Sequence, residues 1–150
     1  MMQKTLSKEI SFQGNALHTG EVVNVKLIPS AENTGIIFVR EDLENAEIPA
    51  LVKYVNRTDR QTILQNGEAS VGTVEHLMAS LYALGIDNLR IELNGSEVPI
   101  LDGSAAPLVD LILEAGIEEQ SVEKNFYVLE ETFTFCLLYT SDAADDGLSV

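Results

Sequence analysis

Two adjacent residues, Glu75 and His76, carry the side chains best suited to hydrolytic chemistry in this sequence. Imidazole is a common zinc ligand, and a glutamate beside a metal-activated water can accept the water's proton as general base. The pair is a weak signal by itself, because it supplies one ligand where catalytic zinc usually has three from the protein. On spacing alone, a histidine at a helix start that binds nothing is the commoner case.

The sequence contains one other histidine, His18, within the Leu-His-Thr-Gly segment at residues 17–20. This segment is expected to join two strands. His18 fits either a turn residue whose ring packs locally or a loop residue that contacts a nearby site. Its position alone favours the turn residue.

The residues around Glu75 and His76 are predicted to form an amphipathic helix. Apolar side chains recur there at three- and four-residue spacing, which places them on one helical face: Val74, Leu77, Met78, Leu81 and Leu84. Thr73 is predicted as the N-cap and Gly85 as the C-terminal stop. The Glu-His pair then lies in the first turn, where free backbone N–H groups collect.

A second helix is predicted to follow a cap at residues 102–104 (Asp-Gly-Ser), with Pro107 in its first turn and Gly116 at its end. Alternating apolar residues and short apolar runs predict strands elsewhere. The expected strands cover residues 23–27, 36–39, 51–55, 62–64 and 89–93. Asn66 and Gly67 predict a tight turn. The expected fold is α+β, with an antiparallel or mixed sheet covered on one face by two helices.

Composition narrows the classes of partner. The 150 residues include 9 basic and 24 acidic side chains, for a net charge of −15. Such an acidic chain is poorly suited to bind nucleic acid through a basic patch. No apolar run reaches membrane-spanning length, and the start has no signal-peptide core. A cytoplasmic protein is therefore expected, and the single cysteine, Cys136, excludes an internal disulfide.

From residue 118 onward the sequence predicts a change in domain organisation. Residues 118–125 are polar and acidic and are interpreted as a linker, so a first domain is expected at residues 1–124. A strand beginning at Phe126 would open a second domain, of which only residues 125–135 are present. Residues 136–150 can be back-translated to a common transposase-based sequencing adapter, whose frame reaches a stop after Val150. We therefore expect this tail to be non-native.

Four motifs together resemble one family. They are Leu-His-Thr-Gly at residues 17–20, Thr-Val-Glu-His-Leu at 73–77, Leu-Gly-Ile-Asp-Asn at 84–88, and Glu-Val-Pro-Ile-Leu-Asp-Gly-Ser-Ala-Ala-Pro at 97–107. In this order and spacing they resemble UDP-3-O-acyl-N-acetylglucosamine deacetylase, a zinc-dependent enzyme of lipid A biosynthesis. The resemblance covers about residues 3–135.

This resemblance implies a role for each candidate residue. His76 resembles one of the family's zinc ligands, Glu75 resembles its general base, and His18 lies in a loop near the site, where a supporting role is expected. The family has two similar α+β domains with the site between them, and its other ligands come from the second domain. This chain is therefore expected to lack deacetylase activity and a tight Zn2+ site by itself. It should also expose the face that normally packs against the missing second domain, and associate.

Two other interpretations stay open from the sequence. The chain fits a small non-enzymatic α+β module that binds a partner through an acidic face. It also fits a deacetylase fused further along to an acyl-carrier-protein dehydratase, as in some relatives.

Overall fold

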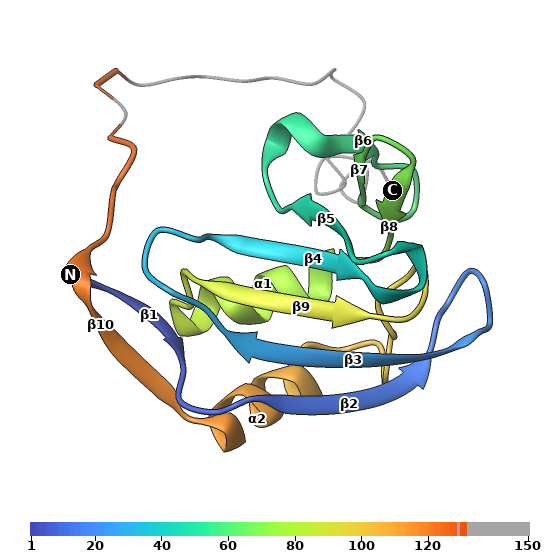
Figure 1. Ribbon diagram of the computed structural model, residues 1–150, viewed down its shortest axis with the longest axis horizontal. Helices are drawn as coiled ribbons and strands as arrows, with labels where there is room; N and C mark the ends of the chain where they lie inside the picture. The colour runs from blue at the N-terminus through green and yellow to red at the C-terminus, as the bar shows by residue number, and fades with distance from the viewer. Residues whose placement is uncertain (129, 132–150) are drawn as a thin grey trace, which may run out of the picture.

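The computed structural model describes residues 1–128 and 130–131 and is built around a five-stranded mixed sheet (Figure 1). The strand order is β2 (Ile10–Asn15), β3 (Val22–Pro29), β9 (Leu89–Leu93), β4 (Ile36–Arg40), β5 (Ala46–Pro49). Only β4 and β9 pair in parallel. Helices α1 (Glu75–Leu84) and α2 (Ala106–Ala115) contact each other and lie on the same side of this sheet. The predicted α+β fold is confirmed.

The core lies between the sheet and the two helices. In β3 the side chains of Val23, Val25 and Leu27 are buried, and the intervening Asn24 is exposed, as the alternation predicts. Strand register sets Val25 opposite Leu93 on β9. Apolar residues from both helices complete this core: Leu77, Leu81, Leu108 and Ile112. Each such side chain contributes about 1.5–3 kcal/mol on full burial, so the sheet holds both helices firmly in place.

Helix α1 ends as predicted but begins differently. Gly85 adopts a left-handed conformation with φ 72°, which a glycine allows at little cost, and its N–H bonds to the helix end. The N-cap position is Val74, and no side chain caps the helix. The predicted N-cap role of Thr73 is therefore wrong. Its hydroxyl donates to the Glu97 carboxylate at 2.7 Å instead of accepting a bond from the helix.

Helix α2 starts at Ala106, with Pro107 in its first turn and Gly116 at its C-cap, as predicted. The N-cap position is Ala105, outside the predicted residues 102–104, but the Ser104 hydroxyl accepts a hydrogen bond from the Ala106 N–H at 3.2 Å. Asp102 instead accepts hydrogen bonds from the backbone N–H and the hydroxyl of Ser104, and so closes a turn ahead of the helix.

A small three-stranded sheet stands beside β5 (Figure 1). It consists of β6 (Val55–Arg57), β7 (Ile63–Asn66) and β8 (Ala69–Val71), and the predicted turn at Asn66 and Gly67 joins the last two. The strand predicted at residues 51–55 is wrong except for its last residue. Val52–Tyr54 form a 3-10 turn, η2, and Val52 is exposed, so its apolar side chain faces no sheet partner.

The chain ends of the described region form a separate two-stranded ribbon. Strand β1 (Met2–Leu6) pairs antiparallel with β10 (Ile117–Glu123). The predicted linker at residues 118–125 is therefore wrong over its first six residues. Its polar side chains lie on a strand whose backbone is satisfied by β1. Residues 126–128 have no regular structure, so the strand predicted from Phe126 is not found there, and residue 129 lies outside the described residues.

The predicted domain boundaries, at residues 124 and 135, stay predictions, and the segment 136–150 lies outside the described residues. Within the part of the chain that the structure describes, no helix has the length and apolar character needed to span a membrane.

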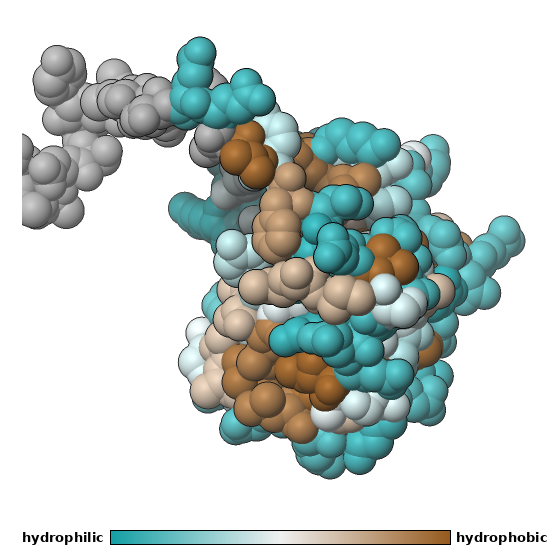
Figure 2. Space-filling view, turned by 90° about the vertical axis from the view of Figure 1, so that its left-hand side faces the viewer, coloured by the Kyte–Doolittle hydropathy of each residue, from teal (hydrophilic) through white to brown (hydrophobic). Residues whose placement is uncertain are grey.

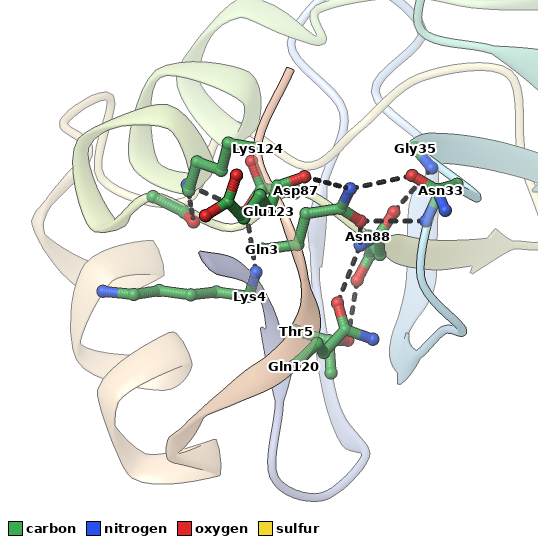
Figure 3. Close-up of polar contacts among 11 residues, drawn as sticks. Gln3, Lys4, Thr5, Asn33, Gly35, Asp87, Asn88, Gln120, Glu123 and Lys124 are labelled. Atoms are coloured by element: carbon green, nitrogen blue, oxygen red, sulfur yellow. Dashed lines mark hydrogen bonds and ion pairs between the residues drawn. The ribbon is translucent and has the colours of Figure 1, made fainter. Parts of the chain in front are cut away.

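A buried polar network ties the ribbon to the main sheet (Figure 3). The Asn88 side-chain amide donates to Gln3 at 2.8 Å and to Gln120 at 2.7 Å, and its oxygen accepts from the Gly35 N–H at 2.9 Å. Asn88 is only 1% exposed. The Leu-Gly-Ile-Asp-Asn motif therefore ends in a structural anchor, and its Asp87 accepts from the Lys4 N–H.

Candidate active site at the start of helix α1

The junction between β8 and α1 is held by backbone bonds to the segment before α2. The Gly72 N–H donates to the Ser96 carbonyl at 2.8 Å, and the Val98 N–H donates to the Gly72 carbonyl at 3.0 Å. These bonds form a parallel bridge between Gly72 and Glu97. The side chain of Gln61 also approaches Gly72 so closely that a Cβ there would collide with it. The helix start is thus fixed by the two backbone bonds, and the Gln61 side chain packs against it.

Thr73 has a strained backbone. Its φ is 53°, and it is 2% exposed. A β-branched residue rarely adopts the left-handed region, and a conformation of this kind costs about 1–3 kcal/mol. The hydroxyl bond to Glu97 at 2.7 Å helps to hold it there. Strain of this kind often occurs at functional sites, and here it comes two residues before Glu75.

Glu75 lies in the first turn of α1, as predicted, and the structure shows it half-buried. Its Oε2 atom accepts a hydrogen bond from the Thr62 N–H at 3.0 Å. Among the described residues, Oε1 receives no hydrogen bond. One oxygen therefore orients the carboxylate, and the other is left for a proton from a reacting group.

His76 also lies in the first turn and is half-buried. Its Nδ1 atom is buried and has no hydrogen-bond partner among the described residues. A buried polar atom without a partner is costly, so the imidazole has an unmet bonding capacity. This fits a residue that binds a metal or another group from outside the described part of the chain.

The described residues do not complete a metal site. No group of three His, Cys, Asp or Glu side chains within them is arranged to hold a metal ion. His76 therefore fits a zinc ion as a single ligand, and the remaining ligands of a three-residue set would come from elsewhere.

Glu97 is the central polar residue of this region, although it is only 2% exposed. Its carboxylate accepts hydrogen bonds from the Thr73 hydroxyl and from backbone N–H groups at residues 17–19. Burial by itself raises the pKa of Glu97, but these hydrogen bonds outweigh burial, and the nearby His18 adds to them, so the pKa lies below its usual range. The sequence has no local signal for this role, because the partners are far away along the chain.

The His18 loop is brought to this site by its backbone. The His18 N–H lies 3.1 Å from both oxygens of Glu97, while the His18 side chain is exposed. His18, Gln61 and Glu97 line a small cleft of about 140 Å³. Glu75 and His76 are not among its lining residues. The structure therefore unites the His18 loop with Thr73 and Glu97, and sets the catalytic candidates beside that cluster.

A larger cavity, of about 360 Å³, lies over β2 and β3 and is lined by Phe12, Lys26 and Glu41 among others. It contains none of the predicted site residues. Its position gives no reason to move the candidate site away from α1.

Comparison with known proteins is consistent with the predicted family. The family model for LpxC, UDP-3-O-acyl N-acetylglycosamine deacetylase, matches residues 3–142. This match includes the first part of the predicted non-native tail, whose assignment stays a prediction.

Among curated relatives, UDP-3-O-acyl-N-acetylglucosamine deacetylase of Myxococcus xanthus is 52% identical over 130 residues, covering 86% of this chain and 41% of that protein. The bifunctional enzyme LpxC/FabZ of Chlorobaculum tepidum is 48% identical over 134 residues, covering 89% of this chain and 29% of that protein. A third relative, the deacetylase of Ruthia magnifica, is 45% identical, with 87% and 43% covered. The chain thus spans less than half the length of these relatives.

The four sequence motifs lie within the matched region, and three of them meet at Glu97 in the structure. The family model covers residues 3–142 of the 150, which is nearly the whole chain. The chain belongs to the LpxC family of UDP-3-O-acyl N-acetylglycosamine deacetylases.

Proposed function

We propose that this chain is part of a zinc-dependent deacetylase that hydrolyses the N-acetyl amide of UDP-3-O-acyl-N-acetylglucosamine in lipid A biosynthesis. The observation that carries the proposal is the Glu75–His76 pair at a fixed helix start, where the buried Nδ1 of His76 has no hydrogen-bond partner among the described residues. The names of the relatives from Myxococcus xanthus and Ruthia magnifica support the same substrate. We assign the parent protein to the cytoplasm.

His76 supplies one ligand to the zinc ion, and the other ligands belong to the missing second domain. Zinc, when bound, polarises the amide carbonyl and activates a water molecule. The missing domain also explains why the described residues contain no complete ligand set. One imidazole is too few to hold catalytic zinc tightly, so this chain alone should bind zinc weakly and be inactive.

Glu75 acts as the general base. The attacking water loses one proton to Oε1 of Glu75, and its oxygen bonds to the acetyl carbon as the C–N bond breaks. The proton held by Glu75 then passes to the leaving nitrogen, so the products are a free amine and acetic acid, which ionises to acetate. The Thr62 N–H holds Oε2 at 3.0 Å, which keeps the carboxylate in one orientation during the reaction. His18 is assigned a supporting role near the substrate.

Two other functions carry less support. The non-enzymatic binding module has no observation in its favour, and family membership favours a hydrolase. The Chlorobaculum tepidum relative is named as a bifunctional LpxC/FabZ enzyme, and for this protein fusion to a dehydratase stays a prediction.

A chimera tests the proposed function. This chain would replace the matching 130 residues of the Myxococcus xanthus relative, and release of acetate from UDP-3-O-acyl-N-acetylglucosamine would be measured. The chimera should be active, and Glu75→Gln should lower kcat at least about 100-fold, as expected for loss of a general base. His76→Ala should lower bound zinc as well as activity.

Glu114→Gln is the matched control, because it makes the same chemical change at an exposed position of α2. It should leave both kcat and zinc content unchanged. The isolated 150-residue chain should show no turnover. An inactive chimera that is folded and zinc-loaded, or full activity in Glu75→Gln, would refute the proposal.

A further inference from the structure

Three segments far apart in the sequence meet on one carboxylate. Oε1 of Glu97 accepts from the Leu17 N–H at 3.1 Å, the His18 N–H at 3.1 Å and the Thr73 hydroxyl at 2.7 Å. Oε2 accepts from the His18 and Thr19 N–H groups, both at 3.1 Å. Among the described residues, Glu97 takes part in no ion pair. Its buried charge is therefore compensated by hydrogen bonds from the loop and from Thr73.

The bond to Thr73 links this cluster to the catalytic candidates. Thr73 lies two residues before Glu75 and has a φ of 53°. Its backbone therefore sets the direction in which α1 begins. Without the carboxylate, the Thr73 hydroxyl would keep only its longer bond to Gln61 Oε1, at 3.2 Å, and the strained backbone could relax toward an ordinary conformation. Such a relaxation would rotate the first helical turn, which carries both Glu75 and His76.

We infer that Glu97 is a positioning residue of this site, whose carboxylate joins the His18 loop to Thr73 and so fixes the orientation of Glu75 and His76. The effect on catalysis rests on the proposed function. The structural link between the His18 loop, Glu97 and Thr73 does not. Glu97 makes no contact with Glu75 or His76 among the described hydrogen bonds. It therefore acts through Thr73 and the backbone bridge to Gly72.

The substitution Glu97→Gln keeps the shape of the side chain but removes its charge and one of its two acceptor oxygens. A glutamine has one acceptor oxygen and one NH2 group, whereas both oxygens of Glu97 accept hydrogen bonds. In one orientation the NH2 group faces the N–H groups of His18 and Thr19. In the other it faces the Leu17 and His18 N–H groups and Thr73. Either way, backbone donors lose their acceptor.

The structural arm of the test uses the 150-residue chain itself. Backbone amide NMR signals of residues 17–19 and 74–76 should both shift in Glu97→Gln. Thr73→Val, which keeps the β-branched shape and removes the hydroxyl, should shift the signals of 74–76 as well. If Glu97→Gln does not fold, Thr73→Val tests whether the Thr73 hydroxyl orients residues 74–76. Unchanged signals at 74–76 in a folded variant would overturn the inference.

The catalytic arm uses the chimera. Glu97→Gln should lower kcat about 100-fold, as expected when catalytic groups are misplaced by about 1 Å, with KM within about threefold of the unsubstituted chimera. Asn88→Ala is the control, because it removes a buried polar residue from the other end of the sheet and should leave both constants within about threefold. An unchanged kcat in Glu97→Gln would overturn the inference while leaving the deacetylase proposal intact. An inactive unsubstituted chimera would refute the proposed function, and the NMR arm would still decide the role of Glu97.

Discussion

The two carboxylates nearest the helix start have opposite surroundings. Glu75 is half-buried and accepts one backbone hydrogen bond, so an oxygen is left for proton transfer. Glu97 is buried and both of its oxygens are occupied by donors. A fully occupied carboxylate is a poor base, because its hydrogen bonds stabilise the ionised form. The chemistry of each residue therefore follows from its hydrogen bonds and not from its residue type.

This difference predicts a pH dependence of stability. The pKa of Glu97 in the folded chain lies below its ordinary value of 4.5, so folding favours the ionised form. Its stabilising contribution should be complete above about pH 4.5 and lost as the pH falls through the lowered pKa. In urea unfolding, Glu97→Gln should cost about 1–3 kcal/mol at neutral pH.

The difference in unfolding free energy between wild type and Glu97→Gln should then shrink as the pH falls below about 4.5. Comparison with the variant cancels other acidic groups with lowered pKa values, such as Asp42 and Asp102. A difference that stays constant down to about pH 3 would contradict an ionised Glu97 in the folded state.

At the scale of elements, some helices and strands are set by the local sequence pattern and others by tertiary contacts. The two helices and the β3 strand follow from apolar periodicity, because one face of each must meet the core. The β10 strand does not, since it is polar and pairs with β1 from the opposite end of the described chain. Asn88 and its partners hold that ribbon against the start of β9 (Figure 3).

Asn88→Ala tests this anchor. It would leave Gln120 Oε1 and the Gly35 N–H without their partner in a partly buried place, and each such orphan group costs about 1–3 kcal/mol. Gln3 Oε1 would keep its bond from the Asn33 N–H. The unfolding free energy should fall by at least about 2 kcal/mol. Amide hydrogen exchange should rise first in β1 and β10. Asn56→Ala, at an exposed position of β6, should change stability by less than about 0.5 kcal/mol.

At the scale of the whole molecule, the helices are covered by the sheet on one side only. Tyr82 of α1 is 88% exposed and Leu113 of α2 is 54% exposed. Figure 2 shows hydrophobic side chains gathered into a patch on the side of the molecule where the β1–β10 ribbon lies. Exposed apolar area of this kind favours association.

Leu113→Glu should therefore weaken self-association of the chain, measured by light scattering across a concentration series. Val22→Glu is the matched control, because Val22 is 55% exposed but lies on β3 instead of a helix. If both substitutions change the apparent mass equally, association does not depend on the helix face. A chain that is monomeric at every concentration would contradict the expectation itself.

The sequence by itself determined the class of fold and the positions of both helices, and it singled out Glu75 and His76 as candidates. These features depend on periodicity, turn residues and residue chemistry, which are local. Tertiary structure decided that Thr73 turns away from the helix, that a polar segment becomes β10, and that Glu97 joins residues 17–19 to residue 73. The physical reason is that a hydrogen bond between distant segments exists only after folding, so no local pattern encodes it. The burial of His76 Nδ1 without a hydrogen-bond partner in the described part of the chain is likewise visible only in the folded structure.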